Sequence, residues 1–323
     1  MTSISTSRNG YPTAFGRHGA LHVQGRHLID SKGNITVLKG LSTHNLSLYP
    51  EYINEELFTQ FVDTYNISLI RLAMYSAEAD DVKGYSDGSE SHRKELEDLI
   101  VTGVEICAKL GIYCMVDWHI LFDYNPNMHR DSACEFFKNI TKKLANYDNV
   151  IYEICNEPNM NLKTGSDKCT WQSITEYANI IIPVIRENDP SKIIIVGTPV
   201  WSQKVNQAAD APLDYDNIMY TLHFYADSHK DELRSILDYA LNKDLPVFVS
   251  EFGICDASGN GPINDDETNK WLDKLNNNSI SYCLWNISNK NETSSIFKPS
   301  FTGHTHFESD DLSECGKRLT LYF

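Results

Sequence analysis

The strongest constraint on the fold is an alternation of eight short apolar runs with amphipathic segments. The runs are Thr36–Leu41, Ser68–Ala73, Tyr113–Trp118, Val150–Cys155, Ile193–Gly197, Ile218–His223, Pro246–Glu251 and Ser281–Trp285. Their nearly continuous apolar character is typical of parallel strands that are buried on both faces. Eight such strands alternating with helices predict an α/β fold, a (β/α)8 TIM barrel.

Three segments between the runs have a helical pattern. The clearest helix is expected over Glu90–Leu110, where apolar side chains form a broad stripe. Gly111 follows at the position that tolerates a left-handed backbone. Further helices are expected over Ile174–Arg186 and Asp231–Leu241. Pro183 either kinks the first of these or marks a wrong boundary.

The whole chain, residues 1–323, is expected to form a single domain, with residues 1–18 as an N-terminal extension. Leu21–Val23 and His27–Ile29 flank Gln24-Gly25, which predicts a short N-terminal β-hairpin. A doubly wound open sheet is the structural alternative. The phosphate-binding glycine motifs that often follow a strand in such sheets do not occur in the sequence.

Composition excludes several classes of partner. The net charge of −16 argues against binding to a phosphate backbone, so no nucleic-acid partner is expected, whereas a neutral polymer is compatible. No apolar run is long enough to span a membrane. The 8 cysteines are too sparse for a disulfide scaffold and form no CxxC pair. Cys114, Cys155 and Cys283 fall in predicted strands and are expected to be small buried hydrophobic residues.

Polar and aromatic side chains gather at the C-terminal ends of the predicted strands. They are His44, Arg71, His119, Asn156 with Glu157, Trp201, His223 with Tyr225, Glu251 and Trp285. In a barrel these strand ends form one rim, which carries the active site. Glu157 and Glu251 each end an apolar run. Two such carboxylates are what hydrolysis of a glycosidic bond requires.

Simpler explanations exist for each of these residues. Each side chain alone is more easily explained as a solvated or structural residue, but their joint occurrence on one rim argues against that explanation. The histidines come from different strands and lack HxH or HExxH spacing, so no metal and no cofactor are expected. A serine hydrolase is not supported because the sequence has no GxSxG motif.

Eight segments, in order from about residue 20 to about residue 320, resemble glycoside hydrolase family 5, most closely its bacterial-type endoglucanase branch. They are Leu38–His44, Ile70–Tyr75, Val116–His119, Ile154–Pro158, Gly197–Gln203, Met219–Tyr225, Val249–Gly253 and Leu284–Lys290. The resemblance implies a (β/α)8 barrel that cleaves β-1,4-glucan internally with retention of configuration. It also implies a secreted enzyme, although Met1–Gly10 lacks the apolar core of a signal peptide.

The resemblance assigns roles to the rim residues. Glu157 would be the general acid/base and Glu251 the nucleophile. Arg71 and Tyr225 would hydrogen-bond Glu251, His223 would lie near Glu157, and Asn156 would hold the sugar 2-hydroxyl. The implied substrate-binding residues are His44, Tyr75, His119, Trp201, Ala257, Trp285, Lys290 and Glu292. Of these, Trp201 would stack on the leaving-group side.

Two departures from the family pattern bear on specificity. His44-Asn45-Leu46-Ser47-Leu48 replaces the common His-Gly-Leu-Gln-Trp, so a distal stacking tryptophan is missing and Tyr49 is a partial substitute. Glu251-Phe252-Gly253 replaces Glu-Trp-Gly.

The expected protein is a monomeric retaining endo-β-1,4-glucanase acting on cellulose and soluble or amorphous β-glucans. Mannan, xyloglucan or mixed-linkage β-glucan as substrate, and a non-catalytic glycan-binding barrel, remain alternatives.

Overall fold

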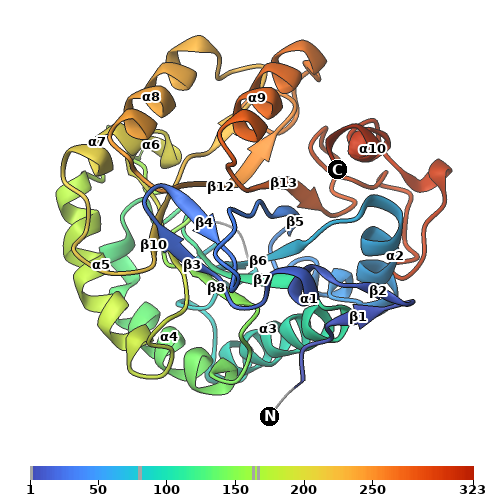
Figure 1. The fold of residues 1–323 in the computed structure, drawn as a ribbon, viewed down its shortest axis with the longest axis horizontal. Helices are drawn as coiled ribbons and strands as arrows, with labels where there is room; N and C mark the ends of the chain where they lie inside the picture. Colours follow the sequence, from blue (N-terminus) through green and yellow to red (C-terminus); the bar gives the residue numbers. More distant parts are fainter. Residues whose placement is uncertain (1–2, 79–81, 162–163, 166–167) are drawn as a thin grey trace.

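A closed barrel of eight parallel strands forms the centre of the computed structural model, which describes residues 3–78, 82–161, 164–165 and 168–323 (Figure 1). The barrel strands are β5 (Lys39–Thr43), β6 (Leu69–Tyr75), β7 (Tyr113–His119), β8 (Val150–Glu153), β9 (Ile194–Val196), β10 (Ile218–Thr221), β12 (Val247–Gly253) and β13 (Tyr282–Ile287). Pairing of β10 with β12 and of β13 with β5 closes the ring. A short extra strand, β11 (Phe224–Tyr225), pairs beside the end of β12. The predicted barrel is therefore confirmed.

Helices surround the barrel on the outside (Figure 1). They are α2 (Glu55–Tyr65), α3 (Glu90–Leu110), α4 (Arg130–Leu144), α5 (Trp171–Arg186), α6 (Pro199–Ser202), α7 (Val205–Asp210), α8 (Asp231–Asn242), α9 (Asp265–Asn277) and α10 (Leu319–Tyr322). Four short 3-10 turns are η1 (Pro50–Tyr52), η2 (Pro126–His129), η3 (Ser309–Asp311) and η4 (Gly316–Arg318). None of the described helices is both long and apolar enough to cross a lipid bilayer.

The three predicted helices are present. The bounds of α3 match the prediction, and Gly111 ends the helix in a left-handed conformation with φ 69°. α5 begins at Trp171, because the Thr170 side chain caps it there, and it continues past Pro183 to Arg186. Pro183 thus lies inside the helix and does not mark its end.

The N-terminal segment covers the end of the barrel opposite the rim. β1 (Ser7–Arg8) pairs with β2 (Tyr11–Pro12), and α1 (Ala14–His18) follows them. The predicted hairpin forms from β3 (His22–Gln24) and β4 (His27–Ile29). The Val23 backbone N–H donates to Asn217, which directly precedes β10. The hairpin therefore caps the N-terminal ends of the strands.

Several predicted strand boundaries were wrong by one to three residues. The first barrel strand begins at Lys39 and not at Thr36, because the Thr36 backbone N–H donates to Leu28 and extends the hairpin. The fourth strand ends at Glu153. Cys155 lies just beyond it, although the residue is fully buried as expected. All eight cysteines are free.

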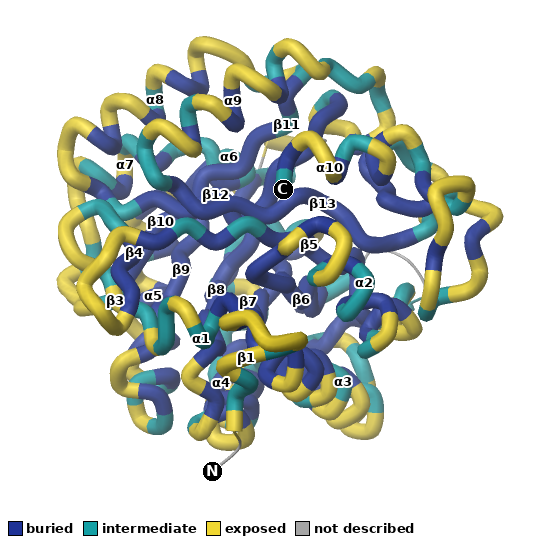
Figure 2. The backbone as a smooth tube through the Cα atoms, turned by 45° about the vertical axis from the view of Figure 1, so that its right-hand side comes forward, coloured by how far each residue is buried: buried dark blue, intermediate teal, exposed yellow. Residues whose placement is uncertain are grey.

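Burial differs between the strands and the helices. The strands are buried along their length, whereas the helices expose their outer faces (Figure 2). Most of the apolar core lies between strands and helices. Inside the barrel, by contrast, Arg71, Asp117 and Glu153 are fully buried charged residues on β6, β7 and β8. The strand pairing places Asp117 directly opposite Glu153. A polar layer therefore lies under the C-terminal rim.

One glycine has no room for a side chain. A Cβ atom on Gly197, at the end of β9, would lie 2.1 Å from the carbonyl oxygen of Cys155 and 2.9 Å from the Pro158 ring. The backbone of β9 thus packs directly against the loop that carries Asn156 and Glu157. This close approach holds the loop in place.

We expect Gly197→Ala to reduce the free energy of unfolding by about 1–3 kcal/mol, since the backbone must move to admit the methyl group. Urea denaturation of the purified variant measures this change. Gly303→Ala is the control, because its methyl group would meet the edge of the Phe301 ring at 3.1 Å in an exposed loop. Equal stability of the Gly197 variant and the wild type would contradict the inferred packing.

Candidate active site

A cavity of about 590 Å³ opens at the C-terminal rim of the barrel. Twelve of the fourteen site residues predicted from the sequence line it: His44, Tyr75, His119, Glu157, Trp201, His223, Tyr225, Glu251, Ala257, Trp285, Lys290 and Glu292. The other two, Arg71 and Asn156, are buried. Segments from all around the barrel therefore converge on one cleft.

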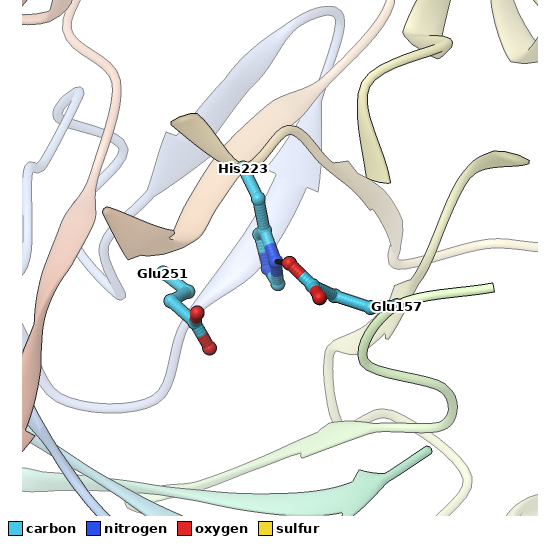
Figure 3. Close-up of side chains that lie close together, drawn as sticks. All are labelled: Glu157, His223 and Glu251. Atoms are coloured by element: carbon cyan, nitrogen blue, oxygen red, sulfur yellow. Dashed lines mark hydrogen bonds and ion pairs between the residues drawn. The ribbon is translucent and has the colours of Figure 1, made fainter. Parts of the chain in front are cut away.

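The two predicted catalytic carboxylates lie close together in this cleft. Glu157 follows β8, and Glu251 lies within β12. Oxygen atoms of both carboxylates and a ring nitrogen of His223 all lie within 4.8 Å of one another. Figure 3 shows the two carboxylates turned toward each other, with His223 against Glu157. Closure of the barrel thus pairs two acids that are far apart in the sequence.

The hydrogen-bonding partners of Glu251 stabilise its ionised form against the effect of burial. The Arg71 Nη1 atom lies 3.1 Å from Glu251 Oε2, and the Tyr225 hydroxyl donates to Glu251 Oε1 at 2.9 Å. Both hydrogen bonds expected from the resemblance are therefore present. Burial raises the pKa of Glu251, but Arg71, His119 and Tyr225 oppose that rise.

Glu157 has a different environment. Burial, together with repulsion from Glu251, raises the pKa of Glu157 well above its usual range. Its carboxyl Oε1 lies 3.0 Å from His223 Nδ1. Burial and the nearby Arg71 hold the pKa of His223 well below its usual range, so the ring is neutral. The pair therefore keeps its proton on Glu157 while Glu251 is ionised, which is the division of roles that an acid and a nucleophile need.

Arg71 does not end its strand, and in this respect the prediction was wrong. It lies near the start of β6 and extends inside the barrel, where its side chain is fully buried. Tyr75 ends the strand. The side chain still reaches the site because inward-pointing residues of neighbouring strands meet in layers within a barrel.

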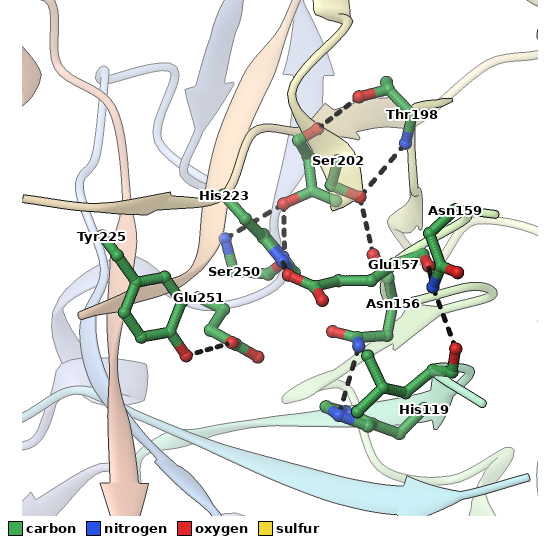
Figure 4. Close-up of polar contacts among 12 residues, drawn as sticks. His119, Asn156, Glu157, Asn159, Thr198, Ser202, His223, Tyr225, Ser250 and Glu251 are labelled. Carbon is green, nitrogen blue, oxygen red and sulfur yellow. Dashed lines mark hydrogen bonds and ion pairs between the residues drawn. The ribbon is translucent and has the colours of Figure 1, made fainter. Parts of the chain in front are cut away.

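Asn156 is also held within the protein. Its side-chain oxygen accepts from Arg71 Nη2 at 2.6 Å, and its amide nitrogen donates to the Ile120 carbonyl oxygen. The amide nitrogen also lies 3.1 Å from His119 Nε2 (Figure 4). The side chain is 1% exposed. The predicted contact with a sugar 2-hydroxyl stays a prediction.

Aromatic rings form one wall of the cleft. The Tyr75 and His119 rings stack at 4.1 Å, and His119 stacks on Trp285 at 5.4 Å. His44 packs against Trp285 with ring centroids 5.1 Å apart. Such a wall offers an apolar face to the C–H faces of a pyranose ring. Beside it, Lys290 forms an ion pair with Glu292 at 2.7 Å.

An unusual backbone turn carries Trp201. Val200, Trp201 and Ser202 all have positive φ angles, of 61°, 53° and 55°. Such a conformation is costly for residues with a Cβ atom, above all for a β-branched one. The Trp201 backbone N–H donates to the Pro158 carbonyl oxygen, and the Ser202 hydroxyl donates to the Asn156 carbonyl oxygen. The strained turn is thus tied to the Glu157 loop.

Three side chains could offer ligand atoms to a metal: Glu157, His223 and Glu251, the one such group found among the described residues. Both ring nitrogens of His223 already have partners, Glu157 at 3.0 Å and Ser250 at 2.9 Å. The acid/base arrangement explains the cluster without an ion, and the absence of a metal stays a prediction.

The family assignment follows from comparison with known proteins. Residues 29–291 match the model of the cellulase family, glycosyl hydrolase family 5. This chain belongs to glycosyl hydrolase family 5. It is 42% identical to endoglucanase A of Butyrivibrio fibrisolvens over 92% of the chain and 67% of that protein. It is 40% identical to an endoglucanase of Clostridium saccharobutylicum over 94% of the chain and 64% of that protein. The chain thus spans about two thirds of the length of these relatives.

Solved structures agree with this assignment. The cellulase Cel5C_n has a TM-score of 0.88 and 40% identity, with 98% of this chain and 94% of that chain covered. The catalytic domain of Thermobifida fusca endoglucanase Cel5A, in complex with cellotetraose, has a TM-score of 0.87 and 31% identity. The match covers 96% of this chain and 98% of that chain. The fold and the family are therefore shown independently of the site.

Sequence reasoning did not single out several polar residues of this family 5 site. Asp117 and Glu153 contact Arg71 at 2.9 Å and 2.7 Å beneath the cleft. Ser250 contacts His223. The available signal was a charged residue inside an otherwise apolar strand run, as Glu153 is in Val150–Cys155. Val200, Gln203 and His229 also line the cleft.

We expect Tyr225→Phe to move the acidic limb of the pH–activity profile to higher pH by about one unit. The lost hydrogen bond favours ionised Glu251, so its removal raises the pKa of Glu251 and more alkaline conditions are needed to ionise it. On that limb the rate falls by about tenfold at a given pH. Initial rates measured across a pH series test this.

Tyr239→Phe is the matched control, because the exposed Tyr239 hydroxyl also donates to a carboxylate, that of Asp210, at 2.6 Å. Its profile should match that of the wild type. An unmoved acidic limb in the Tyr225 variant would contradict the inferred role of the hydroxyl.

Proposed function

We propose that this chain is a retaining endo-β-1,4-glucanase that hydrolyses cellulose and soluble or amorphous β-glucans. The observation that carries the proposal is the approach of Glu157 and Glu251 to within 4.8 Å. Retaining glycosidases need carboxyl groups about 5–5.5 Å apart, whereas inverting enzymes leave about 6.5–9.5 Å for a water molecule. The separation therefore supports double displacement.

In the first step, ionised Glu251 attacks the anomeric carbon and Glu157 gives its proton to the leaving oxygen. A covalent glycosyl-enzyme results. In the second step, Glu157 takes a proton from water, which then attacks the anomeric carbon and releases Glu251. The raised pKa of Glu157 suits its first role. Arg71 and Tyr225 stabilise the carboxylate of Glu251 when it leaves.

The substrate class rests on the relatives and on the cleft. The Butyrivibrio and Clostridium relatives are endoglucanases, and the Thermobifida enzyme is in complex with cellotetraose. The cleft of this chain combines an aromatic wall with polar side chains and is lined by segments that follow several strands. Such a surface suits a neutral polymer. Reducing-sugar assays on carboxymethylcellulose, mannan, xyloglucan and mixed-linkage β-glucan separate the candidate substrates, and highest activity on mannan would contradict the proposal.

We also propose that the protein is secreted, since a β-glucan polymer is too large to enter a cell, and that it is a monomer. Activity confined to the cells rather than the medium of the source culture would contradict secretion. Size-exclusion chromatography with light scattering tests the monomer, for which the expected mass is 36.7 kDa.

We expect Glu157→Gln and Glu251→Gln each to reduce hydrolysis of carboxymethylcellulose by at least about a thousandfold, since each removes an essential group. Circular dichroism checks that both variants remain folded. Glu187→Gln, on an exposed residue after α5, is the control and should keep full activity. Near-normal activity of a folded Glu157 or Glu251 variant would exclude that residue from its role.

The stereochemical course tests the retaining mechanism directly. Proton NMR of fresh hydrolysate should show the β-anomer first, because two displacements at the anomeric carbon restore its configuration. The α-anomer appearing first would instead require an inverting mechanism.

Trp201→Ala should lower kcat/KM on long glucan chains by about twofold to tenfold, the loss expected for one stacking contact. An aryl cellobioside, whose leaving group is a single ring, should lose less than a polymer that continues beyond it. Trp201→Phe should retain most of the activity because it keeps an aromatic face. Equal losses on both substrates would contradict a leaving-side subsite at Trp201.

A further inference from the structure

A buried chain of hydrogen-bonding groups connects Glu157 to Glu153. His223 Nδ1 lies 3.0 Å from Glu157 Oε1, and His223 Nε2 lies 2.9 Å from the Ser250 hydroxyl. The Ser250 hydroxyl donates in turn to Glu153 Oε1 at 2.5 Å. Figure 4 shows the Glu157, His223 and Ser250 part of this arrangement. We refer to Glu157, His223, Ser250 and Glu153 as the proton chain.

Each link in the proton chain needs one hydrogen atom, which limits the arrangements it can adopt. The Thr221 hydroxyl also lies 2.6 Å from that of Ser250 and accepts from the Ser250 backbone N–H. Ser250 is the one acceptor found for the Thr221 hydroxyl among the described residues, so Thr221 donates to Ser250 and leaves the Ser250 hydrogen atom for the chain. His223 is neutral and carries one N–H. If Glu153 is ionised, the Ser250 hydroxyl donates its hydrogen atom to Glu153. His223 then donates from Nε2–H to the Ser250 oxygen. Its Nδ1 carries no hydrogen atom and accepts from protonated Glu157. If Glu153 is protonated, every donor and acceptor is reversed and Glu157 is ionised. Conversion moves one proton from Glu157 to Nδ1, one from Nε2 to Ser250 and one from Ser250 to Glu153.

Arg71 selects between these two arrangements. Its Nε–H donates to Glu153 Oε2 at 2.7 Å, and both side chains are fully buried. A guanidinium has no acceptor and carries a fixed charge, so it favours the ionised carboxylate. Ionised Glu153 in turn requires the arrangement in which Glu157 holds the proton.

We propose that Glu153 is a positioning residue for the acid/base: through Ser250 it fixes the tautomer of His223 and so keeps the proton on Glu157. This inference rests on the proposed role of Glu157 in glycoside hydrolysis. It also explains how Glu157 becomes a base in the second step. After Glu157 has given its proton away, its carboxylate faces the lone pair of Nδ1, which makes recovery of a proton from water favourable.

Other groups act on Glu153 as well. They are Arg71 on β6, Asp117 on β7, Cys155 and Glu157 after β8, His223 after β10 and Cys283 on β13. Glu251 on β12 shares the charge of Arg71 with Glu153. Burial raises the pKa of Glu153 to about 7, and Asp117 adds to this rise while Arg71 opposes it. Among these groups, His223 alone offers a route of hydrogen bonds to Glu157 through Ser250.

The decisive experiment is the pH profile of kcat/KM for Glu153→Gln on a soluble glucan. Arg71 Nε–H must still find an oxygen, so the new amide turns its NH2 group toward Ser250. Ser250 then donates to His223 Nε2, and Nδ1–H donates to Glu157, which stabilises the ionised form of the acid. We expect the basic limb to move to lower pH by about one unit or more.

A second substrate separates this effect from general damage. A dinitrophenyl cellobioside has a leaving group that needs no proton, so Glu153→Gln should slow it much less than the glucan. Equal slowing of both substrates would indicate a structural role only and would overturn the proposal. An unmoved basic limb in a folded variant would overturn it too.

Ser250→Ala tests the chain without disturbing the Arg71–Glu153 ion pair, and it carries the test if Glu153→Gln does not fold. It should move the basic limb in the same direction, and adding Glu153→Gln to it should cause no further movement. An unmoved limb in Ser250→Ala would mean that Glu153 does not act through Ser250, which overturns the proposal. Thr198→Val is the control, because the Thr198 hydroxyl donates to the Thr221 carbonyl outside the chain.

Failure of this inference can be distinguished from failure of the proposed function. A wild-type chain that is inactive on every glucan would overturn the proposed function. An active wild-type chain whose basic limb is unaffected by both variants would overturn the proton chain alone.

Discussion

The site depends on one buried cation, the guanidinium of Arg71. It donates four hydrogen bonds, to Glu153, Ser42, Glu251 and Asn156, and forms a further ion pair with Asp117 at 2.9 Å. Burying a charge is costly unless it is paired and fully hydrogen-bonded, so the strands around Arg71 must supply these oxygens. Removing any one carboxylate would change how strongly Arg71 stabilises the ionised forms of the other carboxylates. The arginine therefore connects the stability of the barrel interior to the charge state of the catalytic pair.

The distribution of protons in the cleft follows from this arrangement. One guanidinium faces the carboxyl groups of Asp117, Glu153 and Glu251, and burial raises the pKa of Asp117 to about 7 despite that attraction. Three carboxylates therefore compete for one positive charge. Glu157 lies farther from the guanidinium and feels the repulsion of Glu251, so it is the group on which a proton is most stable. Glu157 can thus serve as a general acid because the buried carboxyl groups outnumber the buried positive charges.

The sequence predicted the barrel well because parallel strands buried on both faces appear as apolar runs, and eight such runs were visible. It also predicted the rim residues, since residues near the C-terminal ends of strands, such as Glu157 and Glu251, meet once the barrel closes. It could not predict the depth of Arg71 or the role of Glu153. Inward-pointing and outward-pointing positions are both buried in such strands, so alternation does not distinguish them. The turn at Val200–Ser202 was equally invisible, because no glycine marks its positive φ angles.

The charges of the cleft explain why a neutral polymer suits it better than a charged one. The buried cation, Arg71, is surrounded by carboxylates, and Lys290, the lysine that lines the cleft, is paired with Glu292. Among the described residues of the cleft, an anionic substrate would therefore find no uncompensated lysine or arginine, and it would meet a protein whose net charge is −16. Uncharged sugar rings, by contrast, can pack against the aromatic wall of the cleft and hydrogen-bond to the polar side chains beside it. The same buried carboxylates that set the acid/base chemistry thus also disfavour a negative charge on the sugar units next to the scissile bond.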